Sequence, residues 1–191
     1  MAARSLGLAA YRALVRRAGA EPAPEAPARP DGELVWLHAA EPGNVLAVLD
    51  LAKRLLAMRE RLSVLVTLPE SASPADPPPC SAERLFTVPV PGEHPDNVTG
   101  FLDHWRPDLC LWTWGALRPN LVIETAARGC PMVLVDADTA GFDGRRDRWL
   151  PDLTRRLICC FETALARSEA SLKRLVQLGL PRERGVATSP P

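Results

Sequence analysis

Short apolar runs alternate along this chain with longer segments in which apolar positions recur every three or four residues. The runs at 34–37, 63–67, 109–112 and 132–135 are apolar on both faces, which is typical of strands buried inside a parallel sheet. Between the first two runs, the apolar positions of residues 45–56 line one face of a helix. The alternation predicts an α/β fold, a Rossmann-like parallel sheet with helices on both faces.

The remaining pattern extends this alternation to both ends of the sheet. A strand over 85–90 contains Pro89, which ends it or places it at a sheet edge. Asp96 is expected to cap a helix that stops before Pro107. The other expected elements are helices over 119–129, 153–161 and 169–178 and a short strand over 164–166.

Composition divides the chain into four parts. Residues 1–20 carry four arginines and no acid, and their apolar positions lie near helical spacing. This indicates either a docked terminal helix or a helix lying on an anionic membrane surface. Residues 21–32 are rich in proline and alanine and are typical of an extended linker. The Rossmann-like domain is expected over 33–180, and residues 181–191 are expected to connect it to a further domain.

Charge and cysteine usage exclude several classes of function. The chain has 23 basic and 23 acidic residues, so a general nucleic-acid-binding surface is not expected. The five cysteines contain no C-x-x-C pair and are expected to be reduced thiols. The three histidines are scattered, and no metal site is expected.

The junction at 36–44 is the richest candidate for chemistry, because it closes a strand and opens a helix. Ligands of such sheets bind at the carboxyl ends of strands, where His38 stands. Gly43 and Asn44 begin the helix, and a helix N-terminus attracts anionic groups. Plain capping and packing remain the alternative roles for all three residues.

Five separated motifs give the chain a family resemblance. His38-Ala-Ala-Glu-Pro-Gly-Asn44 resembles the His-Ala-Ala-Ser-Val-Gly-Glu motif of the bacterial Kdo (3-deoxy-D-manno-octulosonic acid) transferases. Four more segments follow in the family's order: His-Trp-Arg-Pro-Asp-Leu at 104–109, Leu-Arg-Pro-Asn-Leu at 117–121, Arg-Gly-Cys-Pro with an apolar run and Asp-Ala at 128–137, and Ala-Arg-Ser-Glu-Ala at 166–170.

The resemblance implies the amino-terminal half of a GT-B glycosyltransferase of lipopolysaccharide biosynthesis. In such enzymes this half binds the acceptor, here a lipid A precursor, and a carboxyl-terminal domain binds the donor CMP-Kdo. No cofactor is expected in this half. The expected location is peripheral, on the cytoplasmic face of the bacterial inner membrane, with the basic helix at 1–20 on the membrane surface.

The same resemblance raises a question about the catalytic base. The family's expected base is the final Glu of the first motif, and Asn44 occupies that position. The family's Glu-Thr-Glu corresponds to Trp114-Gly115-Ala116, so those acids are also absent. An amide orients a hydroxyl but does not accept its proton. His38 and Glu41 are the candidates for a relocated base.

The candidate acceptor-binding residues follow the motifs. Each has a structural alternative as a cap, a core side chain or a solvated surface group. They are Gly43, Trp114, Arg118, Asn120, Ser168 and Glu169.

Two functions therefore stay open. One is the acceptor half of a Kdo transferase-like enzyme, inactive without its donor half. The alternative is a catalytically degenerate relative that acts as a binding module. An unrelated nucleotide-binding domain is less favoured, because neither G-x-G-x-x-G nor G-x-x-x-x-G-K-[ST] occurs.

Overall fold

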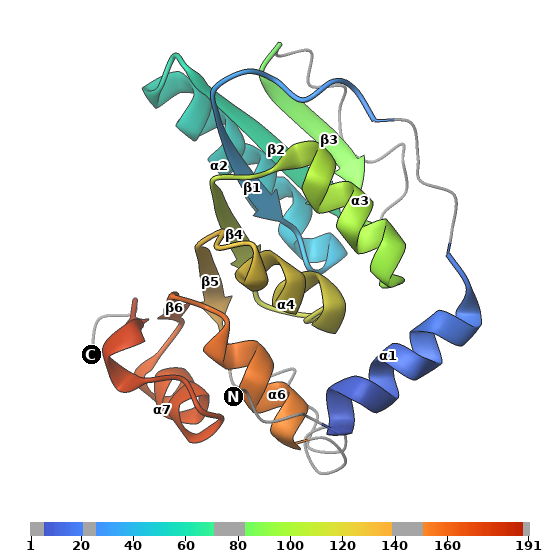
Figure 1. Cartoon of the computed structure of the whole chain (residues 1–191). Coiled ribbons are helices and arrows are strands. Elements are labelled where there is room, and N and C mark those ends of the chain that lie inside the picture. The colour runs from blue at the N-terminus through green and yellow to red at the C-terminus, as the bar shows by residue number, and fades with distance from the viewer. Residues whose placement is uncertain (1–5, 21–25, 71–82, 139–150, 189–191) are drawn as a thin grey trace.

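A computed structural model shows one seven-stranded parallel sheet in the order β3-β2-β1-β4-β5-β6-β7 (Figure 1). The structure describes residues 6–20, 26–70, 83–138 and 151–188. The strands are β1 (Glu33–His38), β2 (Leu62–Leu68), β3 (Leu85–Pro89), β4 (Leu109–Thr113), β5 (Met132–Ala137), β6 (Thr163–Ala166) and β7 (Gly185–Ala187).

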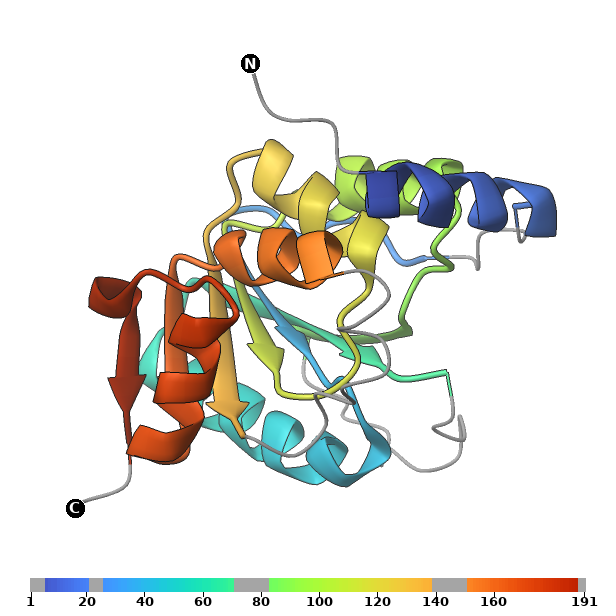
Figure 2. The same ribbon diagram turned by 90° about the horizontal axis from the view of Figure 1, so that it is seen from below.

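Helices lie on both faces of this sheet, which confirms the predicted fold class. Figure 2 shows α2 below the sheet and α1, α3, α4 and α6 above it. The helices are α1 (Leu6–Ala18), α2 (Val45–Met58), α3 (Pro95–Trp105), α4 (Pro119–Ala127), α6 (Pro151–Cys159) and α7 (Glu169–Gln177), with short 3₁₀ turns at η1 (Pro42–Asn44) and η2 (Arg182–Arg184).

The sheet separates two hydrophobic clusters. The larger one joins the sheet to α1, α3, α4, α6 and α7 around the fully buried side chains of Trp36, Trp105, Trp112 and Phe161. The smaller one joins α2 to the opposite face of β1, β2 and β3. Apolar burial on both faces of the central strands stabilises the edge from which the candidate side chains project.

One face of β5, β6 and β7 is less covered than the apolar pattern suggests. Val133, Val135 and Leu165 are half-buried and Val186 is 52% exposed. Within the described residues these four side chains belong to neither cluster. Their chain neighbours face the larger cluster, so the helices among the described residues cover only one face of this part of the sheet.

Two local expectations differ from the structure. His94, and not Asp96, is the N-cap of α3, because the His94 ring accepts a hydrogen bond from the Asp96 backbone N–H at 3.3 Å. The sheet also extends beyond residue 180: residues 185–187, expected within a connection, form β7 and pair with β6. Cys110 is a buried free thiol whose pKa is raised by burial, while Cys80 lies outside the described residues.

Candidate functional site

The carboxyl ends of β1 and β4 meet where the direction of strand succession reverses. From β1 the chain steps outward to β2 and β3, then crosses to β4 on the other side of β1. Ligands of open parallel sheets bind outside the carboxyl ends of the strands at this switch point. His38 ends β1 and is in register with Thr67 of β2 and Trp112 of β4. The candidate site is therefore centred on His38.

A pocket of about 230 Å³ opens at this edge. His38, Glu70 and Arg118 line it with polar groups, and Ala40, Pro69, Val90 and Ala116 complete its wall. A larger hollow of about 430 Å³ is lined by residues that precede β4 and β5, including Arg106 and Gly129. That hollow lies at the amino ends of the strands, so the smaller pocket is the better candidate.

Thr67 determines how the His38 ring is protonated. The Thr67 hydroxyl accepts a hydrogen bond from the Trp36 indole N–H at 2.8 Å and lies 2.7 Å from His38 Nδ1. The Thr67 hydroxyl hydrogen has no other acceptor among the described residues, so we assign it to Nδ1 and the ring proton to Nε2. His38 is 2% exposed, and its ring stacks at a tilt on Trp112 with a centroid distance of 4.0 Å. The ring thus presents an N–H donor to the pocket.

Burial also keeps His38 neutral. Desolvation, with a smaller contribution from the positive charge of Arg118, lowers the pKa of His38 from 6.5 to about 3. A general base must hold a free lone pair toward the proton it takes. Since Nδ1 is engaged by Thr67 and Nε2 carries a proton, this geometry favours His38 as a hydrogen-bond donor to a ligand over a relocated base.

This lowered pKa makes stability depend on pH. Unfolded His38 takes up a proton below pH 6.5, whereas folded His38 does so only near pH 3, so its stabilising contribution is complete above pH 6.5 and is lost as the pH falls. We expect the free energy of unfolding to drop by about 2 kcal/mol between pH 7 and 5 from this group alone. Urea titrations of the wild type and His38→Gln at both pH values measure it. Equal pH slopes in the two proteins would contradict the assignment.

Asn44 faces the end of β4. Its amide nitrogen donates to Thr113 Oγ1 at 3.0 Å and to the Trp114 carbonyl at 3.1 Å. Thr113 Oγ1 also accepts from the Ala40 N–H at 2.9 Å and donates to the His38 carbonyl at 3.1 Å. Asn44 occupies the N-cap position of α2, yet its side chain makes no capping bond. The amide instead ties the start of α2 to β4 beside the candidate site.

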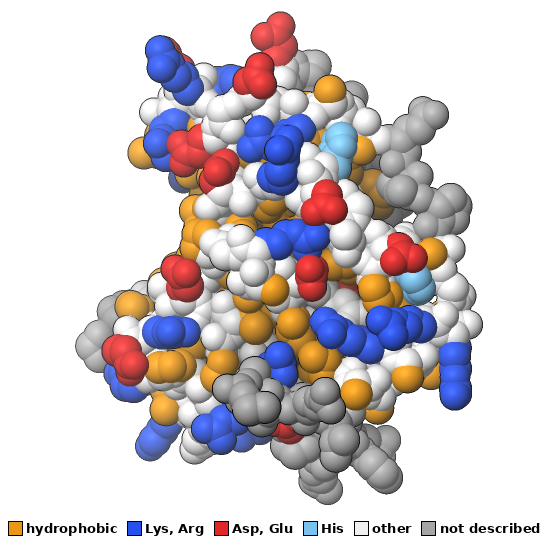
Figure 3. Space-filling model, in the orientation of Figure 1, with side chains coloured by type: hydrophobic (Ala, Val, Ile, Leu, Met, Phe, Trp, Pro, Cys, Tyr) orange, Lys and Arg blue, Asp and Glu red, His pale blue; other side chains and the backbone are white. Residues whose placement is uncertain are grey.

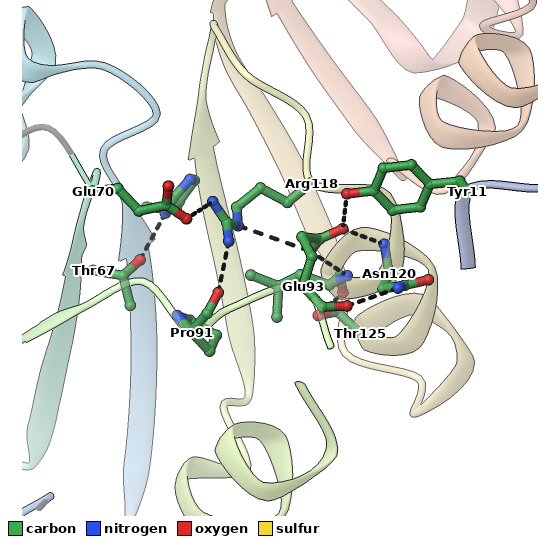
Figure 4. Close-up of polar contacts among 10 residues, drawn as sticks. Tyr11, Thr67, Glu70, Pro91, Glu93, Arg118, Asn120 and Thr125 are labelled. Atoms are coloured by element: carbon green, nitrogen blue, oxygen red, sulfur yellow. Dashed lines mark hydrogen bonds and ion pairs between the residues drawn. The ribbon is translucent and has the colours of Figure 1, made fainter. Parts of the chain in front are cut away.

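Arg118 is held by two carboxylates and a carbonyl (Figure 4). Its Nη2 donates to the Pro91 carbonyl at 2.8 Å, and its Nη1 donates to Glu70 Oε1 at 2.8 Å. Its Nε faces Glu93 Oε1 at 3.8 Å and makes no hydrogen bond within the described residues. The side chain is 16% exposed, so a cation is fixed in the pocket wall with part of its edge open.

Glu93 connects Arg118 to the N-terminus of α4 and to α1. Its carboxylate accepts hydrogen bonds from the Asn120 N–H at 2.8 Å, the Leu121 N–H at 3.2 Å and the Tyr11 hydroxyl at 2.9 Å. A carboxylate in this position satisfies free N–H groups and complements the helix dipole. Glu93 therefore joins three separate segments behind the pocket.

The profile of the family "3-Deoxy-D-manno-octulosonic-acid transferase (kdotransferase)" matches residues 12–189. This chain belongs to that family. The 3-deoxy-D-manno-octulosonic acid transferase of Bordetella pertussis is 29% identical over 155 residues, covering 76% of this chain and 35% of that protein. The Haemophilus influenzae transferase is 23% identical, covering 81% and 36%. The chain spans about a third of the length of these curated relatives.

Solved structures support the fold of this Kdo transferase domain. The UDP-N-acetylglucosamine 2-epimerase of Rickettsia bellii aligns with a TM-score of 0.56 at 14% identity, over 81% of this chain and 44% of that chain. The Neisseria meningitidis UDP-GlcNAc 2-epimerase, solved with UDP-GlcNAc, gives 0.51 at 12% identity over 81% and 45%. At these identities the likeness concerns the Rossmann-like fold alone.

The other expected site residues of the Kdo transferase domain lie in different surroundings. Glu41 is exposed beside Gly115, where an added Cβ would lie 2.8 Å from Glu41 Cγ. Gly43 is exposed in η1, and a Cβ there would meet nothing within 4 Å. Trp114 is half-buried and packs on the larger cluster. These three follow the carboxyl ends of β1 and β4 and do not line the pocket.

Asn120, Ser168 and Glu169 are not brought to the pocket. The Asn120 side chain is buried, donates to the Glu93 carbonyl at 2.8 Å and accepts from Arg12 Nε at 3.0 Å, which favours a structural role. Ser168 caps α7 through the Ser171 N–H at 3.1 Å, and Glu169 is exposed beside it. Their junction follows β6, three strands and about 14 Å from β1.

Sequence reasoning missed Glu70, Glu93 and Tyr11. Glu70 and Glu93 follow β2 and β3 in segments without periodic pattern, and Tyr11 reaches Glu93 across 82 positions of the chain. The structure reveals them because the chain brings both loops to Arg118. Among the described residues no cluster of three or more His, Cys, Asp or Glu side chains could hold a metal ion.

Proposed function

We propose that this chain is the acceptor-binding lobe of an enzyme that transfers Kdo from CMP-Kdo to a lipid A precursor. The observation that carries the proposal is the pocket at the switch point of a Kdo transferase domain, in which fixed Arg118 and neutral His38 offer donors to an anionic acceptor. CMP-Kdo would bind a carboxyl-terminal donor lobe of the same protein. This lobe alone is expected to give no turnover.

The roles follow from the chemistry of each group. Arg118 supplies the positive charge for a phosphate of the acceptor, and the His38 N–H adds a directed donor. Asn44, at the crevice, orients the acceptor hydroxyl without removing its proton. Glu41 is an exposed carboxylate at the same crevice and remains the candidate for a relocated base. Gly43 and Trp114 form the rim against which the sugar would lie.

Helix α1 supports peripheral attachment to the cytoplasmic face of the bacterial inner membrane. It docks through buried Leu8 and through Tyr11, while Leu14 is 67% exposed and Arg16 and Arg17 are exposed. Figure 3 shows basic side chains on the right-hand part of the face that carries α1. Basic residues beside an exposed apolar side chain favour an anionic lipid surface. No described helix has the length and apolarity to span a membrane.

The alternative, a binding module without catalysis, is motivated by Asn44. The family match favours the transferase half, since it covers most of the chain. The two functions share acceptor binding and differ only in whether transfer occurs when a donor lobe is present.

Acceptor binding is tested by co-sedimentation with vesicles. We expect tighter binding to vesicles that contain lipid IVA than to phosphatidylglycerol vesicles of equal charge, because only the former offers the pocket a phosphorylated sugar. Arg118→Ala should remove this preference. Replacing both Arg16 and Arg17 with glutamate should weaken binding to both kinds of vesicle by about thirtyfold or more, since each lost basic residue contributes about 1 kcal/mol at an anionic surface and each glutamate adds repulsion. Equal binding of the wild type to both vesicles would contradict the proposal.

A further inference from the structure

The two carboxylates that face Arg118 are held very differently. The Glu93 side chain is 11% exposed and is fixed by two backbone N–H groups and the Tyr11 hydroxyl. The Glu70 side chain is 70% exposed, and within the described residues Arg118 is its hydrogen-bond partner, at 2.8 Å. One carboxylate is part of the scaffold, and the other is held by a single ion pair at the pocket mouth.

The pocket contains an unused donor next to that ion pair. His38 is more than nine-tenths buried, lines the same pocket as Glu70 and Arg118, and engages Thr67 through Nδ1. No partner of Nε2 occurs among the described residues, and Nε2 is not enclosed by protein atoms. The pocket therefore presents two donors, Arg118 Nη1 and His38 Nε2. Glu70 accepts a hydrogen bond from Arg118 Nη1 only.

We propose that Glu70 is an exchangeable counter-ion of Arg118, displaced by a phosphoryl group when a ligand enters the pocket. This inference rests on the proposed function of the same pocket. It adds that Glu70 pairs with Arg118 and makes the pocket selective while no ligand is bound. A phosphoryl group carries more charge than a carboxylate and has three acceptor oxygens, so it bonds both donors at once. Glu70 accepts from Arg118 alone, and it excludes anions that bind Arg118 more weakly than it does.

The energetics permit the exchange. The Glu70 side chain is 70% exposed and that of Arg118 is 16% exposed, so solvent screens the pair from the carboxylate side and its opening costs little. The released Glu70 carboxylate regains full hydration. Arg118 stays in place when Glu70 leaves, because its Nη2 remains bonded to the Pro91 carbonyl at 2.8 Å and its Nε remains opposite Glu93. The donor geometry thus persists while the counter-ion changes.

Glu70→Gln tests this exchange with inorganic phosphate as the probe. The variant keeps the side-chain length and removes the competing charge, so phosphate should bind about two- to fivefold more tightly than to the wild type. The ¹⁵N resonances of the His38 ring and of the Arg118 guanidinium report binding at the pocket itself. Glu60→Gln removes another exposed carboxylate, which lies outside the pocket, and should leave the affinity unchanged.

Three outcomes would overturn the proposal. They are equal phosphate affinities of the wild type and Glu70→Gln, an equal gain in Glu60→Gln, and binding that leaves the His38 ring resonances unmoved. Absence of phosphate binding to both the wild type and Glu70→Gln would also overturn it. Thermal unfolding of each variant checks that the exposed substitutions leave the fold intact.

A second arm separates a lipid headgroup from a free phosphate. Phosphatidylcholine vesicles with and without phosphatidic acid present the same phosphoryl chemistry on a membrane. A gain for Glu70→Gln on both phosphate and phosphatidic acid vesicles supports exchange by a lipid-borne phosphate. A gain on free phosphate alone supports the exchange but contradicts the glycolipid acceptor of the proposed function, so the two failures are distinguishable.

Discussion

Replacing Asn44 with glutamate is expected to raise the rate of Kdo transfer by about 10²–10⁴-fold when the chain is assayed together with a donor lobe. The substitution restores a carboxylate at the position where the family resemblance places the base. The wild-type amide donates its two hydrogens to Thr113 Oγ1 and to the Trp114 carbonyl. It offers no group that accepts a proton. Glutamate is one methylene longer, so we expect its carboxylate to extend beyond these two partners.

Asn44→Gln is the matched control, because it has the length of glutamate without the basicity. We expect the glutamine variant to transfer no faster than the wild type, and both variants to lose about 1–2 kcal/mol of stability because the bonds of the Asn44 amide to Thr113 and to the Trp114 carbonyl are lost. The assay follows radiolabelled Kdo from CMP-Kdo into lipid IVA. Equal rates for the glutamate and glutamine variants would show that position 44 does not act as the base.

If the wild type already transfers Kdo rapidly, Glu41 becomes the first candidate for the catalytic base. It is an exposed carboxylate that overlies Gly115, whose φ of 143° and lack of a Cβ allow the close approach. His38 is a weaker candidate, since its pKa is lowered to about 3 and the Thr67 hydroxyl occupies Nδ1. Complete absence of transfer in the wild type, with recovery in Asn44→Glu, would support the binding-module alternative.

Local patterns were sufficient to predict the parallel sheet and its buried central strands, whereas the strand order and its switch point came from the structure. Four strands are short apolar runs that can be recognised from the local sequence without knowing what packs on them. They are 34–37, 63–67, 109–112 and 132–135, and all four lie in the sheet. β7 escaped prediction because Gly185–Ala187 offers a single large apolar side chain, exposed Val186. Such a strand is defined by its pairing with β6 and by Gly185, where a Cβ would lie within 2.2 Å of Leu172.

The candidate site was predictable only where it follows strand ends. The rule of carboxyl ends identified His38, Asn44 begins the helix that follows it, and Arg118, in the turn before α4, was identified from the family motif at 117–121. Asn120 was assigned to the acceptor from its place in the same motif, but α4 turns its amide inward to Glu93 and Arg12. Glu93 gave no signal, because its partners come from segments that become neighbours only in the folded chain.

Glu93→Ala is expected to lower the free energy of unfolding by about 3–5 kcal/mol, the largest stability effect we expect at the site. Glu93 is the buried acceptor for the first N–H groups of α4 and for Tyr11, and it faces the enclosed Nε of Arg118. Its removal leaves a nearly buried cation with one exposed partner and leaves a helix N-terminus uncapped. Urea unfolding followed by tryptophan fluorescence measures the loss.

Glu70→Ala provides the matched control, since it also removes a carboxylate from Arg118 but one that is 70% exposed. We expect a loss of at most about 1 kcal/mol. Glu93→Ala should further release α1, because the Tyr11 bond is lost, and so increase tryptic cleavage after Arg16 and Arg17, while Glu70→Ala should not. Equal losses of stability in the two variants would mean that Glu93 is a surface partner of Arg118 and not the buried connection between α1, α4 and the pocket wall.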